Sequence, residues 1–128
     1  MPTAYSEFDL DHKVGDTFRR PLTLSQRETE SDPWEPINLT GYQVVFGVAF
    51  EPGWGVFKLY HTEDSPAYVT IPDAVNGKIL IDVPGPETRA WADYRPFKSY
   101  EVTLIAPDGT RTSILTGTLT LIPEVVRD

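Results

Sequence analysis

We predict a central strand from Tyr42-Gln43-Val44-Val45-Phe46-Gly47-Val48-Ala49-Phe50, which follows the turn Pro36-Ile37-Asn38-Leu39-Thr40-Gly41. Large apolar residues recur at every second position of this stretch, and Gln43, Gly47 and Ala49 fill alternate positions. A period of two places one heavy face of a strand in the core and a lighter face opposite it. The stretch carries no catalytic chemistry, so its role is structural.

The composition fits one β-rich domain. The chain has 128 residues, of which 40% are hydrophobic and 23% charged, and a chain of about this length buries enough surface for its own core. Its 12 prolines and 9 glycines suit short strands joined by turns better than helices. We therefore expect a single domain over residues 1–128 with little helix.

Charge and cysteine content exclude several function classes. The formal net charge is -8, from 19 acidic and 11 basic residues, which opposes binding to phosphate backbones and anionic membranes. We expect neither nucleic acid nor a membrane as a partner. Without cysteine the chain has no disulfide, thiolate metal site or thiol nucleophile. No run approaches the roughly 20 apolar residues of a membrane helix, and the N-terminus does not resemble a secretory signal.

Strand patterns continue on both sides of the central strand. Residues 8–11 and 17–24 are predicted to form a hairpin, with the second strand either at a sheet edge or broken by a bulge, because Pro21 cannot donate to a ladder. Residues 25–35 are acidic and almost free of apolar side chains, which indicates a solvated loop. Further strands are predicted at 56–60, 67–71, 78–83, 97–105 and 114–121, the last two as a hairpin.

These patterns predict an all-β fold, an Ig-like antiparallel β-sandwich of about seven to nine strands. One short helical turn is expected near 87–91, as a crossover between the sheets. Tyr100, at the start of a strand after this crossover, has the setting of a tyrosine corner. The cysteine and the core tryptophan of antibody domains are missing, so the likeness is one of shape.

Two groups of polar residues raise hypotheses of a metal or a hydrolytic site. Asp9, Asp11 and Asp16 offer carboxylates for calcium, but their spacing does not match an EF-hand loop. His61, Asp64 and Ser65 are the residue types of a catalytic triad, but triads are assembled by the fold and rarely from one short loop. We interpret both groups as ordinary surface.

Loop acids are a third group, since glycoside hydrolysis needs two carboxylates at a controlled separation. The candidates are Glu28, Glu30, Asp32, Glu35 and Glu87. Nothing in the sequence fixes their separation, and exposed loop acids are common. We therefore expect no enzymatic activity, no metal and no cofactor.

Three tryptophans are more informative than the acids. Trp54 lies between Gly53 and Gly55 in a loop that is hard to bury, and exposed aromatics serve as protein contacts or sugar-stacking platforms. Local packing of the loop is the alternative for Trp54. Trp91 is interpreted as a plug at the end of the sandwich. Trp34 or Tyr60 would complete a sugar platform with Trp54.

The order of these signals resembles a known family. The motifs are Phe8-Asp9-Leu10, Gly15-Asp16-Thr17-Phe18, Ile37-Asn38-Leu39-Thr40-Gly41-Tyr42, Gly77-Lys78-Ile79, Pro86-Glu87-Thr88, Tyr100-Glu101-Val102, Asp108-Gly109-Thr110, Leu115-Thr116-Gly117-Thr118-Leu119 and Pro123-Glu124-Val125. Together they look like the small Ig-like proteins encoded among tailed-bacteriophage virion genes, and like the N-terminal domain of phage baseplate upper proteins. The family pattern usually has Asp before Leu-Thr-Gly, where this chain has Asn38.

The resemblance implies a virion structural protein, made in the host cytoplasm, that acts as a docking or adaptor domain in the tail, baseplate or fibre-attachment region. Its partners would be other virion proteins in a symmetric multi-copy assembly. We expect contacts at two places: the loop Gly53, Trp54, Gly55 and the threonine face Thr116, Thr118, Thr120. The acidic loop would face solvent or complement a basic partner.

Two alternatives stay open. Decoration of the capsid is a variant of the same structural role. A carbohydrate-binding accessory domain for host recognition is the other, with Trp54 as its stacking residue.

Overall fold

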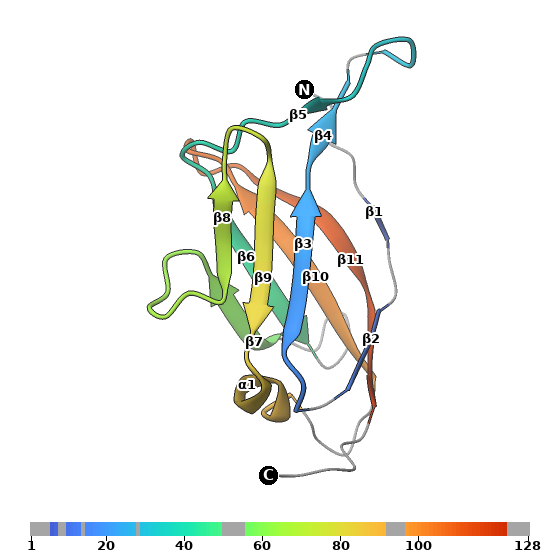
Figure 1. The fold of residues 1–128 in the computed structure, drawn as a ribbon, viewed down its shortest axis with the longest axis vertical. Helices are drawn as coiled ribbons and strands as arrows, with labels where there is room; N and C mark the ends of the chain where they lie inside the picture. Colours follow the sequence, from blue (N-terminus) through green and yellow to red (C-terminus); the bar gives the residue numbers. More distant parts are fainter. Residues whose placement is uncertain are drawn as a thin grey trace.

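The computed structural model describes residues 6–7, 10–13, 15–27, 29–49, 56–91 and 97–122. Within these ranges the chain forms eleven strands and one short helix (Figure 1). They are β1 (Ser6–Glu7), β2 (Leu10–Lys13), β3 (Phe18–Thr23), β4 (Ser25–Gln26), β5 (Glu35–Pro36), β6 (Gln43–Ala49), β7 (Val56–His61), β8 (Val69–Asp73), β9 (Lys78–Val83), α1 (Gly85–Arg89), β10 (Phe97–Ile105) and β11 (Arg111–Ile122). The fold is all-β, as predicted. The number of strands exceeds the predicted range because β1, β4 and β5 are too short to show alternation.

Two sheets face each other across the core. The larger has six strands in the order β1-β11-β10-β6-β7, with β2 also pairing with β11, and the smaller has the order β3-β9-β8. Strands β3, β9 and β8 occupy the places of B, E and D in the immunoglobulin order, and β6, β10 and β11 those of C, F and G. The predicted Ig-like sandwich is therefore confirmed. The exception to antiparallel pairing is that β1 and β2 run parallel to β11.

The predicted hairpin at the N-terminus is wrong. Strand β2 pairs with β11 in the larger sheet, whereas β3 pairs with β9 in the smaller one. Gly15, with φ of 91°, helps turn the chain from one sheet to the other. The alternation of side chains shows which face of a strand is buried, but both sheets offer such a face. The predicted edge position of Pro21 is confirmed, since β3 lies at the edge of its sheet.

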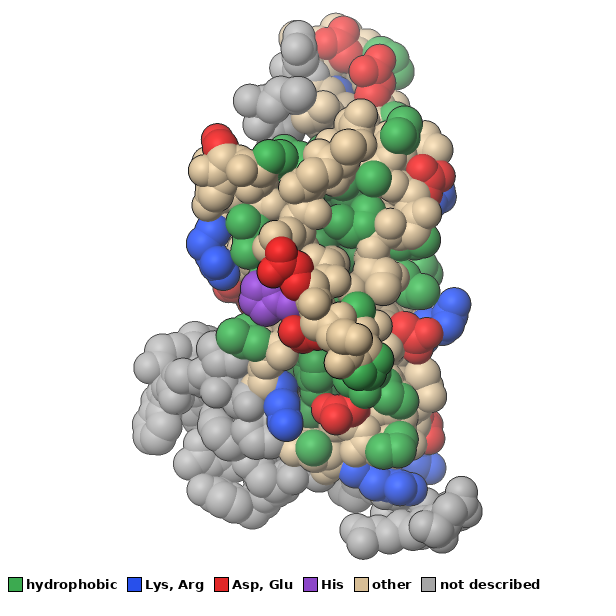
Figure 2. Space-filling view, turned by 90° about the vertical axis from the view of Figure 1, so that its left-hand side faces the viewer, with side chains coloured by type: hydrophobic (Ala, Val, Ile, Leu, Met, Phe, Trp, Pro, Cys, Tyr) green, Lys and Arg blue, Asp and Glu red, His purple; other side chains and the backbone are tan. Residues whose placement is uncertain are grey.

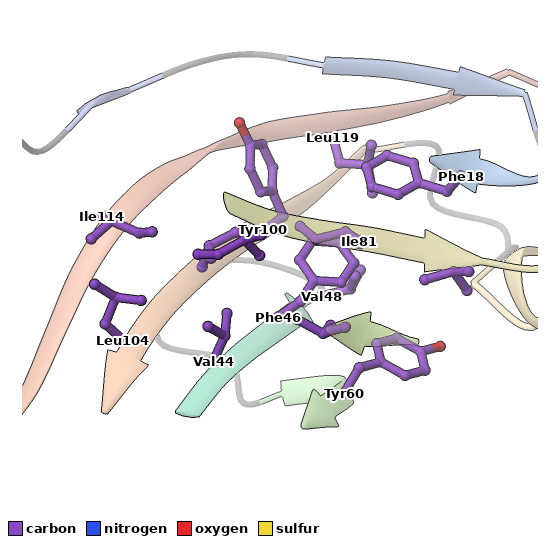
Figure 3. Close-up of a cluster of buried hydrophobic side chains, with 14 of the residues drawn as sticks. Phe18, Val44, Phe46, Val48, Tyr60, Ile81, Tyr100, Leu104, Ile114 and Leu119 are labelled. Carbon is purple, nitrogen blue, oxygen red and sulfur yellow. The ribbon is translucent and has the colours of Figure 1, made fainter. Parts of the chain in front are cut away.

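The sheets enclose a cluster of buried hydrophobic side chains (Figure 3). Phe18 of β3 stacks on Phe46 of β6, with ring centroids 5.5 Å apart and planes inclined by 12°. Other inward-facing residues of β6, β9 and β10 complete the centre: Val44, Val48, Ile79, Ile81, Val83, Tyr100, Val102 and Leu104. Because β6 contributes at every second position, the predicted periodicity is confirmed for its described residues. A single domain over residues 1–128 stays a prediction.

A β-bulge between β10 and β11 decides which side chains of β11 face the core. The pairing register shifts between Val102 and Thr103, which leaves Ile114 as the extra residue on β11. Since the bulge shifts the alternation by one position, Ile114 and Leu119 are both buried. Leu121 is buried too, so the leucines face inward as predicted.

The crossover between the sheets contains the one helix of the described residues. Helix α1 begins at Gly85 and ends at Arg89, slightly earlier than predicted, because Pro86 fits the first turn of a helix. It lies at the lower end of the sandwich in Figure 1, between β9 and β10. Trp91 follows it and is fully buried, which confirms its interpretation as a plug.

Candidate docking surfaces

The predicted threonine face belongs to a broader surface on the outside of the six-stranded sheet. Cross-strand partners lie side by side on one face of a sheet. One row of partners crosses β11, β10, β6 and β7: Thr116, Glu101, Gly47 and Leu59. The next row contains Thr118, Ser99 and Ala49, and Thr120 lies beyond it on β11. We call these eight residues the outer face.

The outer face is made mostly of small side chains. Thr118 is exposed, whereas Thr116 and Thr120 are half-buried by their neighbours. The hydroxyl of Thr116 donates to the carbonyl oxygen of Tyr100 at 3.0 Å, so it is already satisfied within the sheet. Glu101 is the single charged member of the set. Such a surface is level and has few long side chains that a partner would have to displace.

Leu59 gives this face an apolar contact. This residue is 53% exposed, although leucine is one of the larger hydrophobic residues. It lies beside Gly47, where an added Cβ would be only 3.2 Å from Leu59 Cδ2. The missing side chain at Gly47 therefore leaves room for Leu59 to lie across the sheet. The sequence predicted a strand at 56–60 but did not show which of its faces is buried, so the exposure of Leu59 was not foreseen.

The other predicted contact loop lies outside the described residues. Gly53, Trp54 and Gly55 fall between β6 and β7, in the range 50–55 that the structure does not describe. Their role as contacts stays a prediction. On either side of this range β6 and β7 pair antiparallel, with Ala49 opposite Val56.

The predicted sugar platform needs a correction at Tyr60. This residue is 5% exposed and packs inside the sandwich, where it cannot offer a ring face to a ligand. Its hydroxyl accepts a hydrogen bond from Trp91 Nε1 at 2.8 Å and donates to Glu87 Oε2 at 3.1 Å. Burial raises the pKa of Tyr60 to about 12, and the Glu87 carboxylate acts in the same direction.

Trp34 is exposed, in contrast to Trp91. It lies on a two-stranded projection in which β4 pairs with β5, at the upper end of Figure 1. The residue is 55% exposed, and Arg27 Cζ lies 4.4 Å from the centroid of its ring. We call residues 25–27 and 29–36 the arm. The predicted acidic loop is therefore exposed as expected, but it contains a short strand pair that its composition did not reveal.

The hypothetical triad residues do not form a triad. The Asp64 carboxylate accepts a hydrogen bond from the backbone N–H of His61 at 2.9 Å, so it closes the turn after β7. Asp64 N–H in turn donates to the His61 carbonyl. The Asp64 carboxylate therefore binds the backbone of His61. A catalytic triad requires it to bind the His61 imidazole instead.

The acidic candidates do not converge either. Glu30, Asp32 and Glu35 are on the arm, whereas Glu87 is on α1 at the opposite end of the molecule in Figure 1. Asp9 and Glu28 lie outside the described residues, as does the side chain of Asp11. Among the residues that are described, no group of His, Cys, Asp or Glu side chains is arranged to hold a metal ion.

A buried polar network ties the N-terminal turn to α1. Thr88 Oγ1 accepts a hydrogen bond from Gly15 N–H at 3.1 Å, and it lies 2.9 Å from the Asp16 carbonyl oxygen, to which it donates. His12 Nε2 donates to the same carbonyl oxygen at 2.9 Å. Burial lowers the pKa of His12 below its ordinary value of 6.5, against the opposing effect of the Asp16 hydrogen bond. These polar groups serve the fold.

A shallow hollow of about 450 Å³ lies on the outside of the smaller sheet. Tyr68 and Leu80 give it an apolar wall, and Thr17 and Thr70 add hydroxyls. Asp82 also borders it, but Asp82 Oδ2 already pairs with Arg19 Nη1 at 2.7 Å. The hollow therefore combines an aromatic side chain with neutral hydrogen-bonding groups.

The comparisons with known proteins assign no family. A scan against protein-family models found no match, and a search of curated proteins found none either. The described residues contain no helix with the length and apolar character needed to cross a membrane. The candidate surfaces, defined by this chain's own geometry, are the outer face, the arm and the hollow beside Tyr68.

Proposed function

We propose that this chain is a structural protein of a tailed-bacteriophage virion, a docking or adaptor domain of the tail, baseplate or fibre-attachment region. The outer face would bind a neighbouring virion protein, and repeated copies in a symmetric assembly would add avidity to each modest contact. The motif order of the sequence suggests this class of protein. The Ig-like strand order agrees with it but is shared with many other functions.

One observation carries the proposal: the row formed by Thr116, Glu101, Gly47 and Leu59. Small side chains let a second protein approach the sheet closely, since packed sheets lie only about 10 Å apart. Leu59, which is 53% exposed, supplies an apolar anchor at the edge of this level surface. Interface centres are poor in charge, and seven of the eight outer-face residues are uncharged.

Quantitative mass spectrometry tests the virion assignment. Particles are purified from a culture in which the genome that carries this sequence produces phage, and the chain is measured against a major tail protein. We expect a fixed multi-copy ratio. If the chain is abundant in cells but absent from purified particles, the proposal fails. Labelling on intact particles then separates a tail location from the capsid-decoration alternative.

A matched pair of variants tests the outer face. Thr118 and Thr70 are both exposed strand threonines, one on the outer face and the other on the outside of the smaller sheet. Thr118→Arg places a long charged side chain in the contact, so incorporation into particles should fall by roughly 10-fold or more. Thr70→Arg should incorporate normally. Equal incorporation of both variants, with unchanged melting temperatures, would exclude the outer face as the contact.

The hollow beside Tyr68 favours the carbohydrate-binding alternative, because sugars bind to aromatic side chains flanked by neutral hydrogen-bonding groups. The test is an NMR titration of the protein with a panel of mono- and oligosaccharides. Shifts at Thr70 and Leu80 that disappear in Tyr68→Ala would support it. No shift at millimolar sugar would exclude this site.

A further inference from the structure

The arm holds an exposed tryptophan away from the core. Among the residues that the structure describes, strands β4 and β5 pair only with each other, and Figure 1 shows them beyond the end of the two larger sheets. Trp34 precedes β5 directly and keeps 55% of its surface exposed. Tryptophan is among the residues most enriched at the centres of protein interfaces. Trp34 therefore does not contribute to the core, and its exposed ring is available to contact another protein.

The indole is held in place by an arginine. Arg27 Cζ lies 4.4 Å from the centroid of Trp34, a cation–π contact, while Arg27 Nη1 donates to the Glu30 carbonyl oxygen at 3.1 Å. The guanidinium thus links the ring to the tip of the arm. A side chain that is fixed before binding loses less rotamer entropy when a partner covers it. Trp34 is positioned as an anchor.

The base of the arm is fixed to the sandwich. Leu24 N–H donates to the Gly77 carbonyl oxygen at 2.9 Å, and Ile37 N–H donates to the Leu24 carbonyl oxygen at 3.0 Å. Leu24 and Ile37 flank the arm, and Gly77 is in the turn between β8 and β9. The same turn carries Val75, which is 63% exposed. Two of the exposed large hydrophobic residues thus lie on neighbouring segments at one end of the molecule.

The arm is acidic, and this charge indicates what kind of partner could bind it. Between Ser25 and Pro36 the sequence has four acidic residues and one arginine, which already stacks on Trp34. Glu30, Asp32 and Glu35 are all exposed, and Figure 2 shows acidic side chains beside hydrophobic ones at the upper end of the molecule. Such a surface repels phosphate and anionic lipid but attracts a basic protein surface.

We propose that the arm is a second docking surface, on which Trp34 is the anchor and a basic protein surface with apolar side chains is the occupant. This contact is separate from the outer face and goes beyond the function proposed above. The indole supplies the buried contact of such an interface, and the carboxylates around it supply attraction and register.

The test is binding of the full chain to two defined probes, measured by fluorescence anisotropy. One probe is a fluorescein-labelled peptide of lysine and leucine residues, and the other has glutamate in place of each lysine. We expect the lysine peptide to bind and the glutamate peptide not to bind. Trp34→Ala should raise the Kd for the lysine peptide roughly 10-fold or more, whereas Trp34→Phe should retain part of the affinity.

Leu59→Ala is the matched control, since Leu59 is exposed to a similar extent but lies on the outer face. We expect its Kd to stay within about two-fold of the parent value. If Trp34→Ala binds as tightly as the parent, or if Leu59→Ala weakens binding equally, the proposal is overturned. Binding of the glutamate peptide would overturn it too. Particle incorporation of Thr118→Arg tests the outer face independently of this result.

Discussion

Trp91 Nε1 donates a 2.8 Å hydrogen bond to the hydroxyl of Tyr60, and this contact closes the lower end of the sandwich. Trp91 follows α1 in the crossover, whereas Tyr60 belongs to β7 at the edge of the larger sheet. The hydroxyl also donates to Glu87 Oε2, so one phenol ties the crossover to a sheet edge through two bonds. All three polar groups are satisfied within the protein.

Tyr60→Phe should therefore lower the free energy of unfolding by about 1–3 kcal/mol, because it leaves the buried Trp91 N–H without its partner. Chemical denaturation measures the loss. Tyr68→Phe is the control, since no hydrogen bond of the Tyr68 hydroxyl is present among the described residues. Similar losses in both variants would show that the Trp91 contact is not the cause.

The same hydroxyl predicts an alkaline loss of stability. The pKa of Tyr60 is raised from 10.0 to about 12 by burial, so the folded state holds this proton more tightly than the unfolded chain. The contribution of Tyr60 to stability is fully present below pH 10 and is lost as the pH rises to about 12. The free energy of unfolding, measured across this pH range, should decline less steeply in Tyr60→Phe than in the parent protein. Parallel declines would contradict the assignment.

His12 predicts a loss of stability on the acid side. Burial lowers its pKa below 6.5, so the folded state disfavours the protonated imidazole relative to the unfolded chain. Its contribution is present above pH 6.5 and is lost as the pH falls toward the folded pKa. His12→Gln keeps a side-chain N–H donor for the Asp16 carbonyl but does not titrate. Its free energy of unfolding should fall less between pH 6.5 and 5 than that of the parent protein. An equal fall in the two proteins would contradict this assignment.

The sequence predicted which side chains face the core but not which strands are neighbours. The period of two placed Val44, Phe46 and Leu119 correctly, because burial on one face of a strand requires it. For β2 the prediction of a hairpin with β3 was wrong, because its pairing with β11 depends on residues about one hundred positions later. Long-range pairing is decided by the whole sheet, so a local pattern does not contain it.

The candidate sites show the same division. The acidic composition of the arm predicted its exposure, and a lone tryptophan among polar residues and prolines was the available signal for an exposed ring. The burial of Tyr60 was missed because its hydrogen-bond partners lie 27 and 31 residues away in the sequence. An aromatic side chain with a hydroxyl is equally suited to a surface and to a core that satisfies the hydroxyl.

The hydroxyl of Thr88 links the N-terminal turn to α1, and we expect stability to depend on it. Its side chain is fully buried and bonds with both Gly15 N–H and the Asp16 carbonyl oxygen. Thr88→Val keeps the shape but leaves the Gly15 N–H without its partner, so the free energy of unfolding should fall by about 1–3 kcal/mol. Thr88→Ser restores the hydroxyl and should recover most of the loss. Equal stability of the Val and Ser variants would rule out the hydrogen bonds as the cause.

Alanine substitutions at Gly77 and Gly109 distinguish the cost of a steric contact from the cost of a strained backbone conformation. Both have positive φ, 67° and 91°, so alanine is strained at either position by about 1–2 kcal/mol. At Gly109 an added Cβ meets nothing within 4 Å, whereas at Gly77 it would lie 2.6 Å from the Leu24 carbonyl oxygen and 2.9 Å from that of Ile37. These two carbonyls belong to the backbone at the base of the arm, which cannot move aside as a flexible side chain would.

Gly77→Ala should therefore lower the free energy of unfolding clearly more than Gly109→Ala, as measured by urea denaturation. It should also increase amide hydrogen exchange at Leu24 and Ile37, because the base of the arm has to shift to make room. Equal losses in the two variants, with unchanged exchange at the arm, would mean that the arm is not held by this contact.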